Sequence, residues 1–105
     1  MNYQCLFPSV SLQSNFEKTL LRIPQIKIRE HIRQTVENLA QNPCPFHSKS
    51  FKKLKPPIAF EQYLADHRLR VGDYRVLYTI DDHQKIVWIL ALRKRDDRTY
   101  KFLIF

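Results

Sequence analysis

The stretch RLRVGDYRVLYTI, residues 68–80, decides the fold of this chain. Its side chains alternate between apolar and polar, which is the pattern of β-strands with one buried face. The chain's only glycine interrupts the stretch, and a two-residue turn at Gly72-Asp73 would fold it into a hairpin. In that register Arg70 lies directly opposite Arg75.

Arginines on the polar face of this hairpin are the main functional signal. Arg68, Arg70 and Arg75 share one face, and the opposite face carries Leu69, Val71, Tyr74, Val76, Tyr78 and Ile80. Like charges that oppose each other across two strands destabilise the sheet. A chain that keeps such a pair is expected to bind an anion there, and nucleic acid is the most common polyanion in a cell.

Composition predicts one basic domain. The chain has 105 residues, of which 44% are hydrophobic, enough for one modest core. We therefore expect a single domain spanning residues 1–105. The formal charge of +8 is uneven, with +2 in residues 1–48 and +6 in residues 49–105. A basic half of this kind is typical of proteins that bind nucleic acid, anionic membranes or acidic proteins.

Targeting and metal signals are weak. The N-terminus, MNYQCLFPSVSL, lacks a secretion pattern, and the longest apolar run, residues 86–92, is too short to cross a bilayer. We expect a cytoplasmic protein without a membrane partner, in which Cys5 and Cys44 are free thiols. Cys44 and His47 form half of a zinc motif with no second pair, so neither a metal nor a cofactor is predicted.

The N-terminal half predicts a strand followed by two helices. Residues 3–7 alternate as a strand, and a helical stripe begins at Ser9 or Ser11 and ends at Pro24. A second helical stripe follows and is closed by residues 42–43. The two stripes are Leu12, Phe16, Leu20 and Ile23, then Ile28, Ile32, Val36 and Leu39. Residues 43–67 are expected to be a basic connection with a short helical turn at residues 60–64.

The C-terminal half predicts a three-stranded antiparallel meander. A three-residue loop at residues 82–84 would pair Ile80 with Ile86 and place Arg75 opposite Ala91. The same register pairs Tyr78 with Trp88 and Val76 with Leu90. The predicted class is α+β: a strand, a helical hairpin and then three strands, with one helical layer on one sheet.

The order of these elements and motifs resembles the RelE/ParE toxin superfamily, particularly its RelE branch. The resemblance spans nearly the whole chain and rests on LysLysLeuLys (52–55), RLRVGDYRVLY (68–78), WILALRKR (88–95) and the nearby Tyr100. It implies a RelE-like fold and a toxin of a type II toxin–antitoxin system. RelE-like members cleave messenger RNA in the ribosomal A site, whereas ParE-like members inhibit DNA gyrase.

The RelE resemblance implies a role for each arginine. Arg75 and Arg95 would bind the scissile phosphate, Tyr100 would stack on or orient a base, and Arg68 and Arg70 would bind the flanking backbone. RNA is cut without metal when its 2′-hydroxyl attacks the adjacent phosphate, and guanidinium groups stabilise the developing charge. Further RNA- or ribosome-binding candidates are Lys49, Lys52, Lys53, Lys55 and Lys94.

The sequence departs from RelE where that toxin has lysines and this chain has Arg68 and Arg70. Arginine is effectively never deprotonated in proteins, so neither residue is a general base. The alternatives are Tyr100, the pair at residues 96–97, or His67, which alternation turns toward the core. The alternative function is a ParE-like gyrase inhibitor or a degenerate toxin that only binds its antitoxin.

The resemblance also implies partners. It predicts an acidic cognate antitoxin, the ribosomal A site with its mRNA, and contact with operator DNA only through the antitoxin. In the predicted register, Leu77, Val87 and Ile89 form an apolar patch on the arginine face, which we expect the antitoxin to cover. The alternative is that the chain covers this patch itself, with one of Phe51, Leu54, Phe60 or Leu64.

Overall fold

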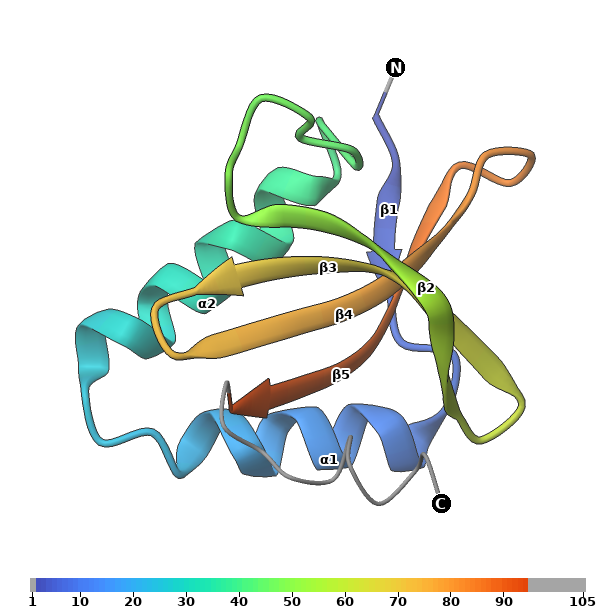
Figure 1. Ribbon diagram of the computed structural model, residues 1–105. Coiled ribbons are helices and arrows are strands. Elements are labelled where there is room, and N and C mark those ends of the chain that lie inside the picture. Colours follow the sequence, from blue (N-terminus) through green and yellow to red (C-terminus); the bar gives the residue numbers. More distant parts are fainter. Residues whose placement is uncertain (1, 95–105) are drawn as a thin grey trace.

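The computed structural model describes residues 2–94, which form two helices and five strands (Figure 1). The elements are β1 (Gln4–Leu6), α1 (Val10–Leu21), α2 (Ile26–Leu39), β2 (Phe51–Phe60), β3 (Tyr63–Val71), β4 (Tyr74–Asp81) and β5 (Ile86–Lys94). The predicted α+β class and the predicted strand–helix–helix beginning are confirmed, but the sheet has one strand more than expected.

Local sequence signals set the ends of α1. Ser9 is its N-cap, and the Ser9 hydroxyl oxygen accepts a hydrogen bond from the Leu12 backbone N–H at 3.2 Å. Such a cap satisfies one of the backbone donors left free in a first helical turn. The helix ends at Leu21, three residues before Pro24, and α2 starts at Ile26. The predicted helical hairpin is therefore confirmed.

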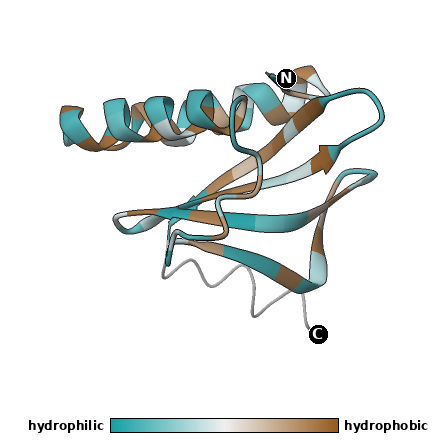
Figure 2. Ribbon diagram, turned by 90° about the horizontal axis from the view of Figure 1, so that it is seen from above, coloured by the Kyte–Doolittle hydropathy of each residue, from teal (hydrophilic) through white to brown (hydrophobic). Residues whose placement is uncertain are grey.

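The sheet places the helices against one of its faces. Its strand order is β1-β5-β4-β3-β2, with β1 parallel to β5 and the other neighbours antiparallel. The two helices lie along one side of the sheet (Figures 1 and 2). Their side chains pack on β3, β4 and β5 in a first core cluster. Its members include Phe16, Leu20, Ile32, Leu39, Leu69, Val76 and Tyr78. The apolar stripes of the sequence thus form the interface between the two layers.

Strand β2 differs from the sequence-based expectation, which makes residues 51–60 part of an irregular connection and places a helical turn at residues 60–64. Instead β2 pairs with β3, and Glu61, at φ 57°, lies in the tight turn between them. Pro56 and Pro57 obscure the strand in the sequence, because proline has no backbone donor. Prolines are tolerated here because β2 is an edge strand and its pairing is interrupted between Lys53 and Ile58.

The predicted register between β4 and β5 is wrong. The turn has four residues, with Lys85 at φ 60°, so Ile80 pairs with Val87. A bulge at Leu90 then shifts the register, since Leu77 pairs with Ala91 but Tyr78 pairs with Ile89. Consequently Arg75 pairs with Arg93 and Val76 with Leu92, in place of the expected Ala91 and Leu90.

The expected apolar patch is not exposed. Leu77 and Val87 are 0% exposed and Ile89 is 1% exposed. Val87 and Ile89 face the helices, because the turn is one residue longer than predicted and inverts the two faces of β5 as far as the bulge at Leu90. Leu77 stays on the arginine side, where the β2–β3 hairpin covers it in a second core cluster. That cluster contains Leu12, Phe60, Ala65, Leu90 and Ala91, with Leu54, Ile58, Tyr63 and Trp88 packed against it. The alternative of coverage by the chain's own Leu54 and Phe60 is therefore the one observed.

Neither helix in residues 2–94 is both long and apolar enough to span a membrane.

Candidate nucleic-acid interface

The β3–β4 hairpin brings two arginines face to face. Gly72 adopts φ +58°, and the turn at residues 72–73 pairs Arg70 with Arg75. This register is the one expected from the sequence. A left-handed backbone conformation costs little at glycine because it has no Cβ. The only glycine of the chain thus sets the position of both arginines.

A third arginine extends the pair onto the next strand. Arg75 pairs with Arg70 on one side and with Arg93 on the other. Directly paired residues project from the same face of a sheet, so the three arginines form a row across β3, β4 and β5. The Arg93 guanidinium carbon lies 5.0 Å from the centre of the Phe60 ring, a cation–π contact that positions this side chain.

Arg75 is the residue in this row with an unsatisfied donor. Its Nε atom is buried, and it has no hydrogen-bond partner within residues 2–94. A buried donor without a partner costs free energy, more so on a charged group. A phosphate oxygen is a suitable acceptor, because guanidinium groups bind phosphate through charge-assisted hydrogen bonds.

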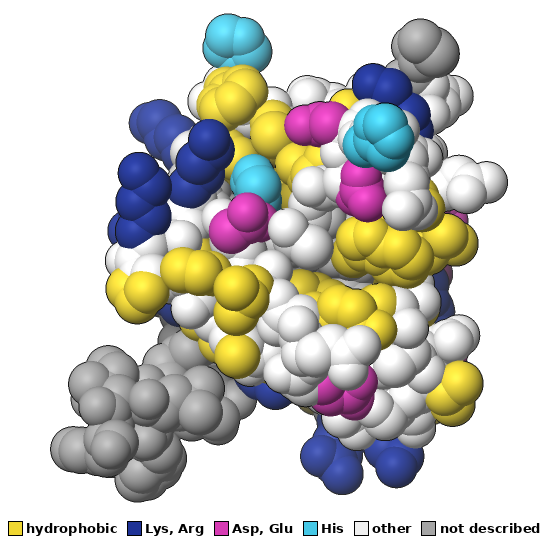
Figure 3. All heavy atoms as spheres, turned by 90° about the vertical axis from the view of Figure 1, so that its right-hand side faces the viewer, with side chains coloured by type: hydrophobic (Ala, Val, Ile, Leu, Met, Phe, Trp, Pro, Cys, Tyr) yellow, Lys and Arg dark blue, Asp and Glu magenta, His cyan; other side chains and the backbone are white. Residues whose placement is uncertain are grey.

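Further cations lie near the row, on the arginine face at Lys52 and on the opposite face at Lys53, which pairs with His67. Arg68 pairs with Lys52 of β2 and with Leu77 of β4, which places both cations on the arginine side. Lys52, Lys53 and Lys55 are exposed on β2, and Lys49 is exposed in the preceding loop. Figure 3 shows Lys and Arg side chains gathered at one border of the molecule, beside a histidine and an acidic side chain. Lys94 is exposed at the end of β5, so all five predicted lysines are accessible.

His67 lies on the opposite face, as alternation predicts. It pairs with Tyr78 in the sheet, and its ring stacks on the Tyr78 ring at 5.3 Å between centroids. His67 is only 8% exposed. Its ring is therefore directed away from the arginine row and does not provide a general base there.

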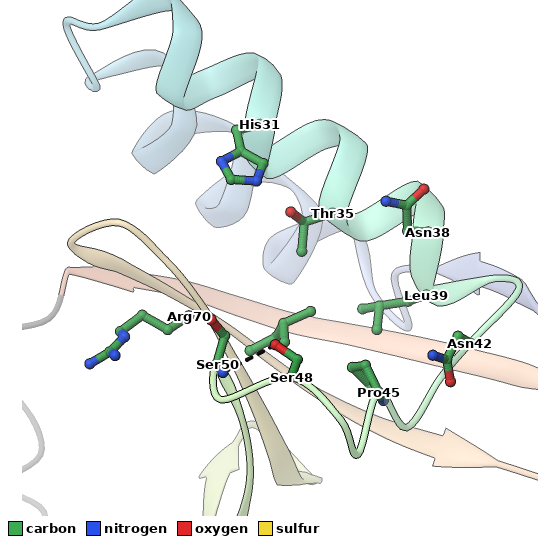
Figure 4. A pocket seen from close by; sticks show the side chains of 10 residues that line it. His31, Thr35, Asn38, Leu39, Asn42, Pro45, Ser48, Ser50 and Arg70 are labelled. Carbon is green, nitrogen blue, oxygen red and sulfur yellow. Dashed lines mark hydrogen bonds between the residues drawn. The ribbon is translucent and has the colours of Figure 1, made fainter.

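A pocket of about 340 Å³ lies on the helix side, between α2 and the loop before β2 (Figure 4). His31, Thr35 and Asn38 line it from α2, and Pro45 and Ser48 line it from the loop. Arg70 borders the pocket, but its side chain points away from the other residues that line it. Arg70 thus belongs both to the pocket lining and to the arginine row, whereas Arg75 and Arg93 do not line this pocket.

The remaining predicted site residues, Arg95 and Tyr100, lie outside the described residues, as do the alternative bases at positions 96–97. Within residues 2–94, no group of three or more His, Cys, Asp or Glu side chains is arranged to hold a metal ion. The sequence places Arg93 on the arginine face, by alternation with Ala91, but assigns it no specific role. The predicted register pairs Arg75 with Ala91, whereas in the structure Arg75 pairs with Arg93.

Comparison with known families gives one extensive match. The family model described as "ParE toxin of type II toxin-antitoxin system, parDE" matches residues 10–99. No curated protein matches the sequence significantly.

Solved structures share the fold. The archaeal RelE–RelB complex from Pyrococcus horikoshii contains a chain with 24% identity and a TM-score of 0.68; the match covers 92% of this chain and 99% of that one. The toxin–antitoxin complex RelBE2 from Mycobacterium tuberculosis matches with 24% identity and a TM-score of 0.59, covering 90% and 100%. A mutant of Escherichia coli toxin RelE in the free state matches with 16% identity and a TM-score of 0.56, covering 96% and 93%.

Proposed function

This chain belongs to the ParE toxin family of type II toxin–antitoxin systems, and we propose that it is a ribosome-dependent, metal-independent endoribonuclease that cleaves mRNA and inhibits translation. The observation that carries the proposal is the row of Arg70, Arg75 and Arg93, in which the buried Nε of Arg75 has no partner within residues 2–94. Such a row is costly without an anion and suits a phosphodiester.

The proposed reaction uses the RNA's own nucleophile. The 2′-hydroxyl attacks the adjacent phosphorus, the bond to the 5′-oxygen breaks, and a cyclic phosphate and a 5′-hydroxyl result. Negative charge increases on the phosphoryl oxygens in the transition state, and preorganised guanidinium groups stabilise it. Arg75 and Arg95 act on this phosphate, Arg68 and Arg70 hold the flanking backbone, and Tyr100 orients a base.

The proton of the 2′-hydroxyl needs a separate acceptor. The guanidinium groups of Arg68, Arg70 and Arg75 stay protonated and serve only as electrostatic groups. Tyr100, a carboxylate at positions 96–97 or a ribosomal group accepts the proton in this scheme. Dependence on the ribosome follows naturally if the ribosome supplies that group.

The proposed partners are an acidic antitoxin, the ribosomal A site and mRNA. Two of the similar solved structures are toxin–antitoxin complexes, and the charge of +8 favours an acidic partner. The five exposed lysines would contact ribosomal RNA, whose phosphates attract them without sequence preference. Contact with operator DNA is assigned to the antitoxin.

Inhibition of DNA gyrase is the second candidate. The family match favours it, because the matched family is named for ParE, and a gyrase inhibitor needs no general base. The two candidates predict different dependence on the arginine row, since only the nuclease needs it for bond cleavage.

One experiment separates them. After brief induction, transcript 5′ ends are mapped in vivo while gyrase supercoiling is assayed with purified protein. New 5′ ends in translated regions with normal supercoiling support the nuclease. Blocked supercoiling without new ends would establish the gyrase inhibitor instead.

A further inference from the structure

The Cys44 side chain, from the loop before β2, meets the side chains of two consecutive β3 residues, Asp66 and His67. The Cys44 sulfur lies 3.9 Å from Nε2 of His67, and Nδ1 of His67 lies 2.5 Å from Oδ1 of Asp66. A thiol, an imidazole and a carboxylate are therefore arranged in series. Neither Cys44 nor Asp66 has a role in the proposed RNA cleavage.

The surroundings fix the imidazole. His67 is packed between the Phe51 ring, 5.7 Å away, and the Tyr78 ring, 5.3 Å away. The Tyr78 hydroxyl donates to the Pro43 carbonyl at 2.7 Å, which ties the residue next to Cys44 onto the sheet. Ring packing thus fixes the His67 imidazole, and the Tyr78–Pro43 hydrogen bond fixes the loop that carries the Cys44 thiol.

The hydrogen bond to Asp66 selects the useful tautomer. A carboxylate accepts a hydrogen bond, so Nδ1 of a neutral His67 carries the hydrogen and Nε2 keeps its lone pair toward Cys44. Burial raises the pKa of the Cys44 thiol, while nearby Lys53 lowers it and Asp82 and Asp66 raise it. The resting group is a thiol, and its reaction as a nucleophile requires a base such as His67.

We propose that Cys44 is a modification site, where His67 acts as general base and Asp66 orients it, and that its ligand is an anionic small-molecule disulfide. The Cys44 sulfur attacks one sulfur of the disulfide as its proton passes to Nε2 of His67. The disulfide bond breaks, and the departing thiolate takes that proton. One protein mixed disulfide and one free thiol are formed, so atoms and electrons balance.

Charge and space favour an anionic reagent. Lys53 pairs with His67 in the sheet, and exposed Lys49, Lys52 and Lys55 lie on the same basic segment. Cys44 is half-buried, and the pocket of about 340 Å³ begins at the next residue, Pro45. A bound acidic thiol therefore finds opposite charge and room beside its attachment point.

Cys5 provides an internal control. It is also half-buried, but its thiol donates to the Val36 carbonyl at 3.2 Å, and burial raises its pKa to about 11. The Cys5 thiol thus faces a backbone carbonyl, whereas the Cys44 thiol faces an imidazole that can accept its proton. Faster reaction at Cys44 than at Cys5 in the folded chain is the first expectation.

The test measures the rates of mixed disulfide formation by mass spectrometry, with oxidised glutathione as the anionic probe and bis(2-hydroxyethyl) disulfide as the neutral probe. Asp66→Asn, at a half-exposed position, should slow modification of Cys44 by about ten-fold. His67→Phe keeps an aromatic ring in the stack and should slow it by about 100-fold. Both variants should leave the rate at Cys5 unchanged, which also reports that the fold is intact.

A separate variant tests whether Cys44 prefers an anionic disulfide. Lys53→Gln should lower the ratio of the glutathione rate to the neutral-probe rate at Cys44, whereas Lys27→Gln on α2 should not. Unchanged Cys44 rates in a folded Asp66→Asn variant, or a Cys44 rate no higher than that of Cys5, would overturn the proposal. An unchanged ratio in Lys53→Gln would overturn the anionic preference. These measurements do not use RNA cleavage, so their outcome does not depend on the result of the nuclease assay.

Discussion

Arg70 and Arg75 are directly opposed across β3 and β4, in the second residue pair from the turn at residues 72–73. Gly72 adopts a left-handed conformation in this turn, which glycine tolerates without strain. Both arginines are half-buried, so water screens their repulsion less than at an open surface. The hairpin is consequently less stable than its apolar pairs alone would make it. This cost is the strongest structural indication that the face binds a polyanion.

Replacement of one opposed arginine should therefore stabilise the free protein. Arg70→Glu converts a repulsive pair into an attractive one, and we expect the free energy of unfolding in urea to rise by about 0.5 kcal/mol. The gain should shrink as salt is added, because it is electrostatic. RNA cleavage should fall in the same variant. A loss of stability at low salt would contradict the proposed repulsion.

Arg75→Ala tests catalysis. Its guanidinium is assigned to the scissile phosphate, so cleavage on ribosomes should fall by about 100-fold or more, the usual effect of losing one transition-state donor. The melting temperature should not fall, since the variant also removes a buried unsatisfied donor. Arg33→Ala, an exposed arginine on α2, is the matched control and should cleave normally. Full activity in a folded Arg75→Ala variant would exclude the arginine row as the active site.

The lysines of residues 49–55 should affect ribosome binding more than the RNA cleavage step. Replacing Lys49, Lys52, Lys53 and Lys55 by glutamine should weaken ribosome binding and reduce the slope of log affinity against log salt by about 0.7 for each phosphate that no longer binds a lysine. The single-turnover rate at saturating ribosome should stay within a few-fold. Lys18→Gln combined with Lys27→Gln, both exposed on the helices, provides the control. An unchanged slope would remove this segment from the docking surface.

The sequence is informative where one local signal decides the structure. Ser9 and Pro24 delimit the first helix of the hairpin, and Gly72 sets the Arg70–Arg75 register, so both features are predictable. Prediction fails where a distant contact outweighs a local signal. Pro56 and Pro57 argue against a strand, yet β2 forms because β3 offers an edge. The bulge at Leu90 leaves no mark in the sequence, because each possible register buries a plausible set of apolar residues.

The same distinction applies to the sites. Arg68, Arg70 and Arg75 stand two to seven positions apart, so alternation and the two-residue turn at Gly72-Asp73 together place them on one face. Cys44 and His67 are separated by 23 positions, and the sequence suggests only half of a zinc motif for Cys44. Their proximity depends on how the loop before β2 packs against Tyr78, which no local pattern encodes.

The turn at Gly72 gives a stability test of the fold. Gly72 has φ +58°, and an added Cβ would meet only the Ile28 Cδ1 atom at 3.7 Å, an ordinary contact. Gly72→Ala should therefore lower the free energy of unfolding by about 1 kcal/mol through backbone strain alone. Gly72→Asn should cost less, because asparagine tolerates this conformation. Equal stability of the alanine variant and the wild type would contradict the turn geometry.

Cys5 predicts a pH dependence of stability. Burial raises the pKa of its thiol from 9.0 to about 11, so the folded chain retains a proton that the unfolded chain releases. The stability linked to this proton is fully present below about pH 9 and is lost as the pH rises toward 11. In Cys5→Ser the hydroxyl can still donate to the Val36 carbonyl but does not titrate in this range. Urea unfolding should therefore show wild type losing stability relative to Cys5→Ser between pH 9 and pH 11, with a constant difference between pH 6 and pH 8. A difference that stays constant up to pH 11 would mean that the Cys5 thiol titrates alike in the folded and unfolded chain, and that its burial beneath α2 is not maintained in solution.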